Sequence, residues 1–143
     1  PEADVPVFQL SIDYYAKPEY HYELGKQLKS LREKGVLIIG SGALIHNLPL
    51  AMKKMQSNDS SPYGWEMEYD NWVKEQIDKR NISNIINYQN SHKLGKLAAP
   101  TPDHFVPVLY SLGLMDSKDE IHYFFESESS LPAFGERSFI IKQ

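Results

Sequence analysis

Residues 35–48 (GVLIIGSGALIHNL) constrain the fold of this chain more than any other segment. The apolar run 36–39 lies between glycines, and four consecutive aliphatic residues in that setting are typical of a strand buried on both faces. The glycines that follow predict a sharp turn. Since ligands of open α/β sheets bind just beyond the carboxyl ends of strands, His46 is a candidate for chemistry. The alternative is a turn histidine that hydrogen-bonds to its own loop.

The residues before this segment predict a strand and then a helix. Residues 5–13 (VPVFQLSID) are rich in apolar and β-branched side chains, with Pro6 restricted to the start of the strand or to an edge. A helix is expected to begin at Pro18 and to end at Gly35. Its apolar stripe consists of Tyr20, Leu24, Leu28 and Leu31. Together with the strand 36–39, these elements form a βαβ unit, which predicts a right-handed crossover and a parallel strand pair.

Further elements are expected after His46. A polar connection that contains the turn formers 58–62 precedes a helix from Gly64 or Trp65 to about Lys79. The side of this helix that is expected to face the core consists of Trp65, Tyr69, Trp72, Val73 and Ile77. The remaining elements are an irregular helical piece within 81–97 and two closing strands, 120–125 and 137–141, around the loop 126–135.

A third long helix carries the second candidate histidine. Thr101 suits the N-cap, and Pro102 suits the first helical position because its missing N–H costs nothing there. Gly113 is expected to end this helix. Its buried stripe consists of Phe105, Val108, Leu109 and Leu112. His104 falls in the first turn, where the partial positive charge of the helix N-terminus favours the neutral imidazole that a metal ligand must have.

Composition limits the functions that the chain can serve. Its 143 residues are enough for one domain with a core. A net charge of −4 disfavours a nucleic-acid surface, and no apolar run approaches the roughly 20 residues of a membrane span, so neither partner is expected. No secretory signal is visible, and a cytoplasmic location is expected. Because cysteine is absent, His, Asp and Glu are the available metal ligands.

Other side chains are weaker candidates. His21 is expected to be a surface or capping histidine at the start of the first helix. His92 lies in a predicted loop and His122 in a predicted strand, and none of these has ligand spacing such as H-x-x-x-H. Ser41 lacks the wider G-x-S-x-G spacing of a hydrolase nucleophile.

Three motifs in a fixed order carry a family resemblance. They are residues 3–13 (ADVPVFQLSID), residues 35–42 with His46-Asn47-Leu48, and residues 100–105 (PTPDHF) with Pro107, Leu109, Tyr110 and Leu112-Gly113. Together they resemble the C-terminal half of the class III extradiol ring-cleavage dioxygenases of LigB type, in particular the 4,5-DOPA dioxygenase branch. The similarity runs from about residue 2 to residue 116.

The resemblance implies a role for each candidate histidine. In that family the histidine of the H-N-L motif is an acid–base catalyst beside the metal, and this role falls on His46. The histidine of the P-T-P-E-H motif is a metal ligand, and this role falls on His104. We therefore expect the two imidazoles to converge within about 10 Å of each other. Asp103 stands where the family usually has Glu, and Pro49 where it commonly has Arg.

These observations predict an α/β domain of LigB type, three-layer α/β/α with a mixed central sheet, of which residues 1–143 are the C-terminal part. The resemblance implies that further metal-binding histidines come from an N-terminal half. The complete protein is expected to open catechols with O₂ and Fe(II), with Zn(II) as the alternative metal. This chain alone is expected to be inactive, to hold no ordered catalytic metal, to expose apolar strand faces, and to pack against the missing half or a second copy.

Two alternatives belong to other functional classes. The first is a non-catalytic binding or structural module that keeps the fold. The second is a metallopeptidase or hydrolase on a similar α/β core, but the carboxylate-rich site that it needs cannot be assembled from this sequence.

Overall fold

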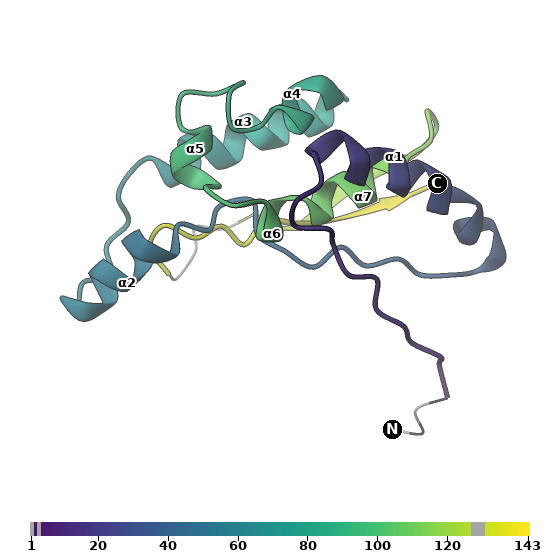
Figure 1. The fold of residues 1–143 in the computed structure, drawn as a ribbon, viewed down its shortest axis with the longest axis horizontal. Helices are drawn as coiled ribbons and strands as arrows, with labels where there is room; N and C mark the ends of the chain where they lie inside the picture. Colours follow the sequence, from purple (N-terminus) through teal and green to yellow (C-terminus); the bar gives the residue numbers. More distant parts are fainter. Residues whose placement is uncertain (1, 3, 127–130) are drawn as a thin grey trace.

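The computed structural model describes residues 2, 4–126 and 131–143, and the chain forms a mixed α/β fold (Figure 1). Its elements, in chain order, are α1 (Pro18–Leu28), the 3-10 helix η1 (Lys29–Lys34), α2 (Leu48–Gln56), α3 (Glu66–Asp78), α4 (Ile82–Ile86), α5 (Gly95–Ala98), α6 (Pro102–Phe105), α7 (Pro107–Gly113), β1 (Glu120–Phe125) and β2 (Ser138–Lys142). Part of the predicted loop 126–135 lies outside the described residues. No helix within the described ranges is long and apolar enough to cross a membrane.

The first helix begins and ends where the sequence predicts. Pro18 opens α1, and Gly35 ends η1 with φ of 76°, a left-handed conformation that glycine adopts without strain. α1 packs on α7, and His21 lies between them, fully buried, with its Nδ1 3.0 Å from the hydroxyl of Tyr110. The expectation that His21 is a surface or capping residue is therefore wrong, because this turn of α1 faces the core.

Helix α2 occupies the connection after His46 that the sequence predicts to be polar. It begins directly after Asn47, whose side chain accepts a hydrogen bond from the N–H of Leu50 at 3.1 Å and caps the helix. Ala51 is the only buried residue of α2. On the same side as Ala51, at helical spacing, lie three exposed apolar residues, Leu48, Met52 and Met55. The helix is not among the predicted elements, although its apolar residues have the helical period.

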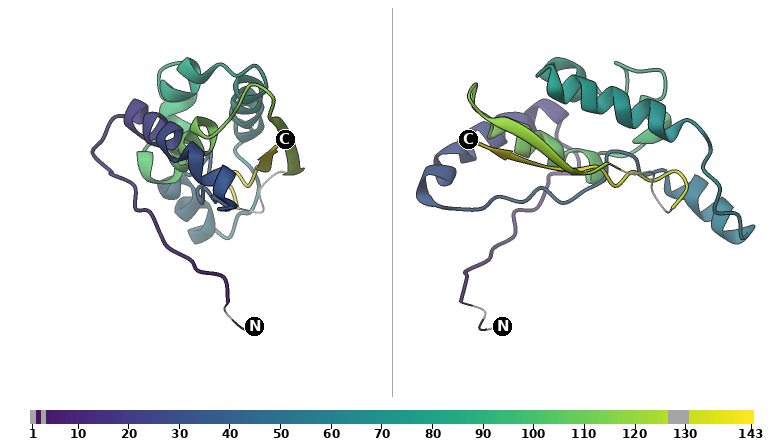
Figure 2. Two further views of the ribbon diagram at one scale, coloured as in Figure 1. Left: turned by 90° about the vertical axis from the view of Figure 1, so that its right-hand side faces the viewer. Right: turned by 180° about the vertical axis from the view of Figure 1, so that it is seen from behind.

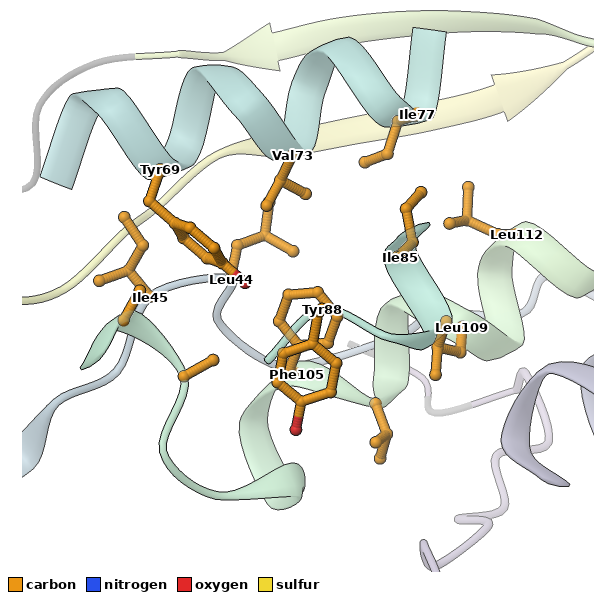
Figure 3. Close-up of a cluster of buried hydrophobic side chains, with 13 residues drawn as sticks. Leu44, Ile45, Tyr69, Val73, Ile77, Ile85, Tyr88, Phe105, Leu109 and Leu112 are labelled. Atoms are coloured by element: carbon orange, nitrogen blue, oxygen red, sulfur yellow. The ribbon is translucent and has the colours of Figure 1, made fainter. Parts of the chain in front are cut away.

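The core lies where α3 packs over α4 and α7 (Figure 3). Tyr69, Val73 and Ile77 are fully buried on one face of α3, at the i, i+4, i+8 spacing of a helix. Below them the ring of Tyr88 stacks on that of Phe105, with centroids 3.9 Å apart. The predicted core face of α3 is confirmed.

The helix predicted from Pro102 to Gly113 is two short helices, α6 and α7, joined at Val106. Pro107 explains the break, because it has no N–H to donate and its ring opposes a continuous helix. Thr101 occupies the N-cap with extended dihedral angles, but its side chain makes no capping hydrogen bond.

The sheet in the described residues has two strands. β1 and β2 pair antiparallel, with Ile121 opposite Ile141. Both predicted closing strands are confirmed, with β2 shifted by one residue relative to the predicted range 137–141.

The predicted parallel strand pair is not formed. Residues 5–13 and 36–39 are extended but have no strand partner in the described part of the chain, and Val7 and Leu37 are 89% and 78% exposed. Figures 1 and 2 show the N-terminal segment leaving the body of the molecule. An extended segment becomes a strand only where a neighbour pairs with its backbone. The described residues therefore lack the predicted three-layer arrangement, whereas the exposed apolar segments are present as expected.

Candidate functional site

His46 and His104 meet in the folded chain. Their rings are stacked, with centroids 4.9 Å apart and planes 16° apart. Two backbone hydrogen bonds of 2.8 Å join residues 43–46 to residues 98–104. One runs from the N–H of Ala43 to the carbonyl of His104, and the other from the N–H of His46 to the carbonyl of Ala98. The predicted convergence is confirmed, and the roles of the two histidines stay predictions.

Glycines allow this close approach. A Cβ on Gly42 would lie 2.1 Å from the carbonyl oxygen of His104, and a Cβ on Gly40 would lie 2.8 Å from that of Pro107. Both distances are too short for a real side chain. The sequence predicts a sharp turn at these glycines. In the structure, they let the segment pack directly on the backbone of α6 and α7.

The imidazole of His46 is 2% exposed and has a carbonyl oxygen at each nitrogen. Nδ1 lies 3.1 Å from the carbonyl of Ala43, and Nε2 lies 3.0 Å from the carbonyl and 3.3 Å from the hydroxyl of Thr101. A neutral imidazole has one N–H and donates to only one carbonyl. Burial lowers the pKa of His46, while the two carbonyls oppose part of this shift. The neutral form is therefore favoured at pH 7.

His104 is oriented by the carboxylate beside it. Its Nδ1 lies 2.8 Å from Oδ2 of Asp103, so an Nδ1–H would donate to the carboxylate and leave the Nε2 lone pair for a metal. Desolvation raises the pKa of Asp103, but interactions with Thr101 and His104 outweigh it and hold the pKa below its ordinary value. Asp103 is therefore charged at neutral pH.

Three donor side chains gather at this place. His46, Asp103 and His104 each offer a ligand atom, and these atoms lie within 4.8 Å of one another. Oδ1 of Asp103 is buried and has no hydrogen-bond partner in the described ranges. The motif assigns a ligand role to His104 alone, and this assignment stays a prediction. The structure places Asp103 beside it as a further donor. The adjacency of Asp103 to His104 was the available signal for the additional carboxylate.

The remaining candidates lie outside this donor group. Among the described residues, no other histidine belongs to a set of three potential metal ligands. The ring of His92 packs against Trp72, with centroids 5.0 Å apart, and His122 lies 3.2 Å from the carboxylate of Glu120. Ser41 is exposed. None of the three therefore adds to the site.

A groove of about 710 Å³ adjoins the site, a volume in the range of small-molecule sites. Residues 35–44, α7 and β2 form most of its lining. His104 also lines the groove, whereas His46 and Asp103 do not. Of the three donors, His104 is therefore the one that borders this open space.

Comparisons with known proteins point to the same family as the H-N-L and P-T-P-D-H motifs. A family model described as "Catalytic LigB subunit of aromatic ring-opening dioxygenase" matches residues 2–134. The chain is 36% identical over 124 residues to the 4,5-DOPA dioxygenase extradiol of Escherichia coli (strain K12), and 35% identical over 113 residues to that of Beta vulgaris. These matches cover 85% and 79% of this chain but 44% and 41% of the relatives. The chain thus spans less than half the length of these relatives.

A solved structure gives the same result. The crystal structure of an uncharacterized protein from Escherichia coli K12 superposes with a TM-score of 0.82 at 32% identity, over 97% of this chain and 56% of that chain. The likeness therefore includes sequence as well as fold. With a family model that matches almost the whole chain, the resemblance is confirmed: the chain belongs to the LigB family of catalytic subunits of aromatic ring-opening dioxygenases.

Proposed function

We propose that this chain supplies part of the active site of an extradiol dioxygenase that opens catechol rings with O₂. The observation that carries the proposal is the stacked pair of His46 and His104, because the H-N-L and P-T-P-D-H motifs meet there. A DOPA-type catechol is the proposed substrate class, since the Escherichia coli and Beta vulgaris relatives are named 4,5-DOPA dioxygenase extradiol.

The donors present fit a non-haem iron. His104 would hold Fe(II), or Zn(II) as the alternative, through Nε2, and Asp103 would fix the ring through the 2.8 Å contact to Nδ1. Oδ1 of Asp103 is buried, has no hydrogen-bond partner among the described residues, and is a second donor of suitable chemistry. When bound, the metal would supply Lewis-acid and redox chemistry toward the catechol and O₂. The part of the LigB domain that this chain does not span is proposed to supply the other ligands.

His46 is proposed to accept and return a proton. Its lowered pKa keeps the imidazole neutral at pH 7, the form in which it can act as a general base. With Nδ1–H donated to the carbonyl of Ala43, Nε2 is the basic nitrogen, and Thr101 must move its carbonyl, at 3.0 Å, and its hydroxyl, at 3.3 Å, to admit substrate. A catechol hydroxyl would replace that of Thr101 and give its proton to Nε2.

A non-catalytic module is the second candidate function. The observation that favours it is the environment of His46, whose two nitrogens both face carbonyl oxygens of this chain. A histidine held in this way joins residues 43–47 to the start of α6, a structural role that needs no reaction at its nitrogens. The two candidates differ in a measurable property, because only the first needs a free Nε2 during reaction.

A chimaera tests the choice. The 124 residues of this chain that align with the Escherichia coli 4,5-DOPA dioxygenase extradiol would replace the matched region of that protein, and the unmodified relative would serve as the positive control. Oxygen uptake with Fe(II) and 3,4-dihydroxyphenylalanine would be measured in an oxygen electrode. We expect Fe(II)-dependent uptake by the chimaera and a loss of at least 10²-fold in His46→Ala, as for removal of a general base.

The controls separate function from folding. His122→Ala changes an exposed histidine on β1 and should keep full activity. A chimaera that unfolds cooperatively and binds iron but takes up no oxygen would favour the non-catalytic module. Unchanged activity in His46→Ala would remove the proposed role of that residue.

A further inference from the structure

Residues 131–135 run antiparallel to residues 45–47, next to the candidate site. Two backbone hydrogen bonds, of 2.9 and 3.0 Å, join the two segments, and between them His46 and Phe134 form an isolated bridge. In an antiparallel pair flanked by hydrogen bonds in this way, the two opposed side chains lie close together on one face. The ring of Phe134 also meets that of His104 edge-on, with centroids 6.5 Å apart. Phe134 therefore adjoins both histidines of the site.

Ala133 has an unfavourable backbone conformation in this segment. Its φ is 58°, in the left-handed region that residues with a Cβ rarely adopt. It is fully buried, and its carbonyl accepts the hydrogen bond from the N–H of Asn47. A strained residue keeps such a conformation only where its surroundings fix it. The groups that fix Ala133 therefore also fix how this segment lies against His46.

The side chain of Glu66 is one of these groups. Its Oε1 accepts hydrogen bonds from the N–H of Ala133 at 3.1 Å and from the N–H of Tyr63 at 2.9 Å. Burial raises the pKa of Glu66, but these hydrogen bonds, with further ones from the start of α3, outweigh it and hold the pKa below its ordinary value. The carboxylate is therefore charged at neutral pH, although Glu66 is only 8% exposed. It joins the start of α3 to the segment that carries Phe134.

Glu66 is not the residue that stability alone favours at this place. Its Oε2 is buried and has no hydrogen-bond partner in the part of the chain that the structure describes. A buried charge with an unpaired oxygen is costly, and an apolar side chain of similar volume avoids that cost. A carboxylate does, however, form stronger hydrogen bonds with N–H groups than a neutral acceptor does. The residue therefore suits a task that depends on the position of Ala133.

We propose that Glu66 is a positioning residue for ring opening, acting through Ala133. By fixing that residue, it keeps Phe134 packed beside the stacked rings of His46 and His104. This role rests on the proposed function, since its purpose is to keep Nε2 of His46 within reach of the catechol proton. A displacement of about 1 Å at such a group can cost about 100-fold in rate.

The alternative is a purely structural role. Glu66 occupies the first position of α3, where a negative charge stabilises the N-terminus of a helix. That role requires the charge, whereas the positioning role requires an acceptor for the N–H of Ala133. The two roles therefore respond differently to a neutral side chain that still accepts hydrogen bonds.

Two neutral variants of similar length separate these roles. Glu66→Gln keeps an oxygen that can accept from Ala133, and Glu66→Met keeps the volume but has no strong acceptor. Both are made in a chimaera with the Escherichia coli relative in which the part from this chain extends to residue 143. With Fe(II) and 3,4-dihydroxyphenylalanine, Glu66→Met should lower kcat about 10- to 100-fold, with KM and bound iron within about threefold of the unmodified chimaera. Glu66→Gln should recover kcat to within about threefold.

A second change tests whether Ala133 transmits the effect. Glycine adopts a left-handed φ without strain, so Ala133→Gly should remove part of the need for the carboxylate. The double variant Glu66→Met/Ala133→Gly should regain at least threefold in kcat over Glu66→Met alone. Glu75→Ala, a change at an exposed carboxylate of the same helix, should leave kcat unchanged.

Nuclear magnetic resonance of the 143-residue chain gives a readout that needs no reaction. An aromatic ring shifts the proton signals of groups beside it, so the imidazole signals of His46 and His104 report where Phe134 lies. At one fixed pH, Glu66→Met should move both sets of signals, and Glu66→Gln should leave them in place. The imidazole of His122, which is exposed on β1, serves as the internal reference.

Each outcome decides the proposal. Unchanged kcat in Glu66→Met, or equal losses in the Gln and Met variants, would overturn it. Loss of bound iron or of cooperative unfolding in Glu66→Met would assign Glu66 to the fold and overturn it as well. So would imidazole signals of His46 and His104 that stay in place. If the unmodified chimaera opens no ring, the proposed function fails, and the signals of the 143-residue chain still decide whether Glu66 holds the two histidines.

Discussion

The imidazole of His46 lies parallel to that of His104, with 4.9 Å between ring centroids, although the two residues belong to separate motifs. Only His104 borders the groove, while both nitrogens of His46 face carbonyl oxygens. The pair is therefore asymmetric. One ring has a nitrogen free for a ligand, and the other is held by the backbone around it.

This asymmetry predicts a split between metal binding and catalysis. In the chimaera with the Escherichia coli relative, His104→Ala should lose most of the bound iron because it removes a direct ligand. His46→Ala should keep nearly all of its iron and lose ring opening. Metal analysis after gel filtration measures the difference, and equal loss of iron in the two variants would contradict the assignment.

A second prediction concerns Asp103, whose carboxylate contacts Nδ1 of His104 at 2.8 Å. Asp103→Asn removes the charge that orients the ring, and iron affinity in the chimaera should fall about 10- to 100-fold, as for other partners of metal-binding histidines. Asp103→Glu restores the residue usual in the family and should recover most of the affinity. Titration of Fe(II) under anaerobic conditions provides the measurement, and Asp59→Asn at an exposed loop carboxylate should have no effect.

His21 should make stability depend on pH. Burial lowers its pKa below the value of about 6.5 in an unfolded chain. The unfolded state therefore binds more protons than the folded state as pH falls through 6.5, and the unfolding free energy decreases. Denaturant unfolding of the 143-residue chain at pH 7.5 and 5.5 should show this decrease, and His21→Gln should show a smaller one. An equal decrease in both proteins would mean that other groups cause it.

The contact between α1 and α7 should be sensitive to a single methyl group. A Cβ on Gly25 would lie 2.5 Å from the carbonyl oxygen of Tyr110, which belongs to rigid helix backbone. Gly25→Ala should therefore destabilise the chain by about 1–3 kcal/mol despite the better helix propensity of alanine. Gln27→Ala, at an exposed position of the same helix, should stay within about 0.5 kcal/mol. Thermal unfolding of both variants compares the two effects.

The sequence by itself determined the elements whose signals are local. Pro18 and Gly35 mark the ends of the first helical unit, and the apolar spacing of α3 gave its core face. The sequence also predicted both closing strands. Two of its motifs predicted that His46 and His104 converge. These inferences hold because capping, helical period and strand alternation depend on residues that are close together in the chain.

Tertiary structure alone decided the features that depend on distant groups. Residues 36–39 have the composition of a buried strand, yet they remain unpaired because no neighbouring strand supplies hydrogen bonds to them in the described chain. His21 is buried because α7 covers it, and Nε2 of His46 faces the carbonyl of Thr101 because residues 43–46 pack beside the start of α6. Burial and strand pairing are properties of two surfaces in contact. Residues far apart in the chain supply these surfaces, so a local sequence pattern cannot specify them.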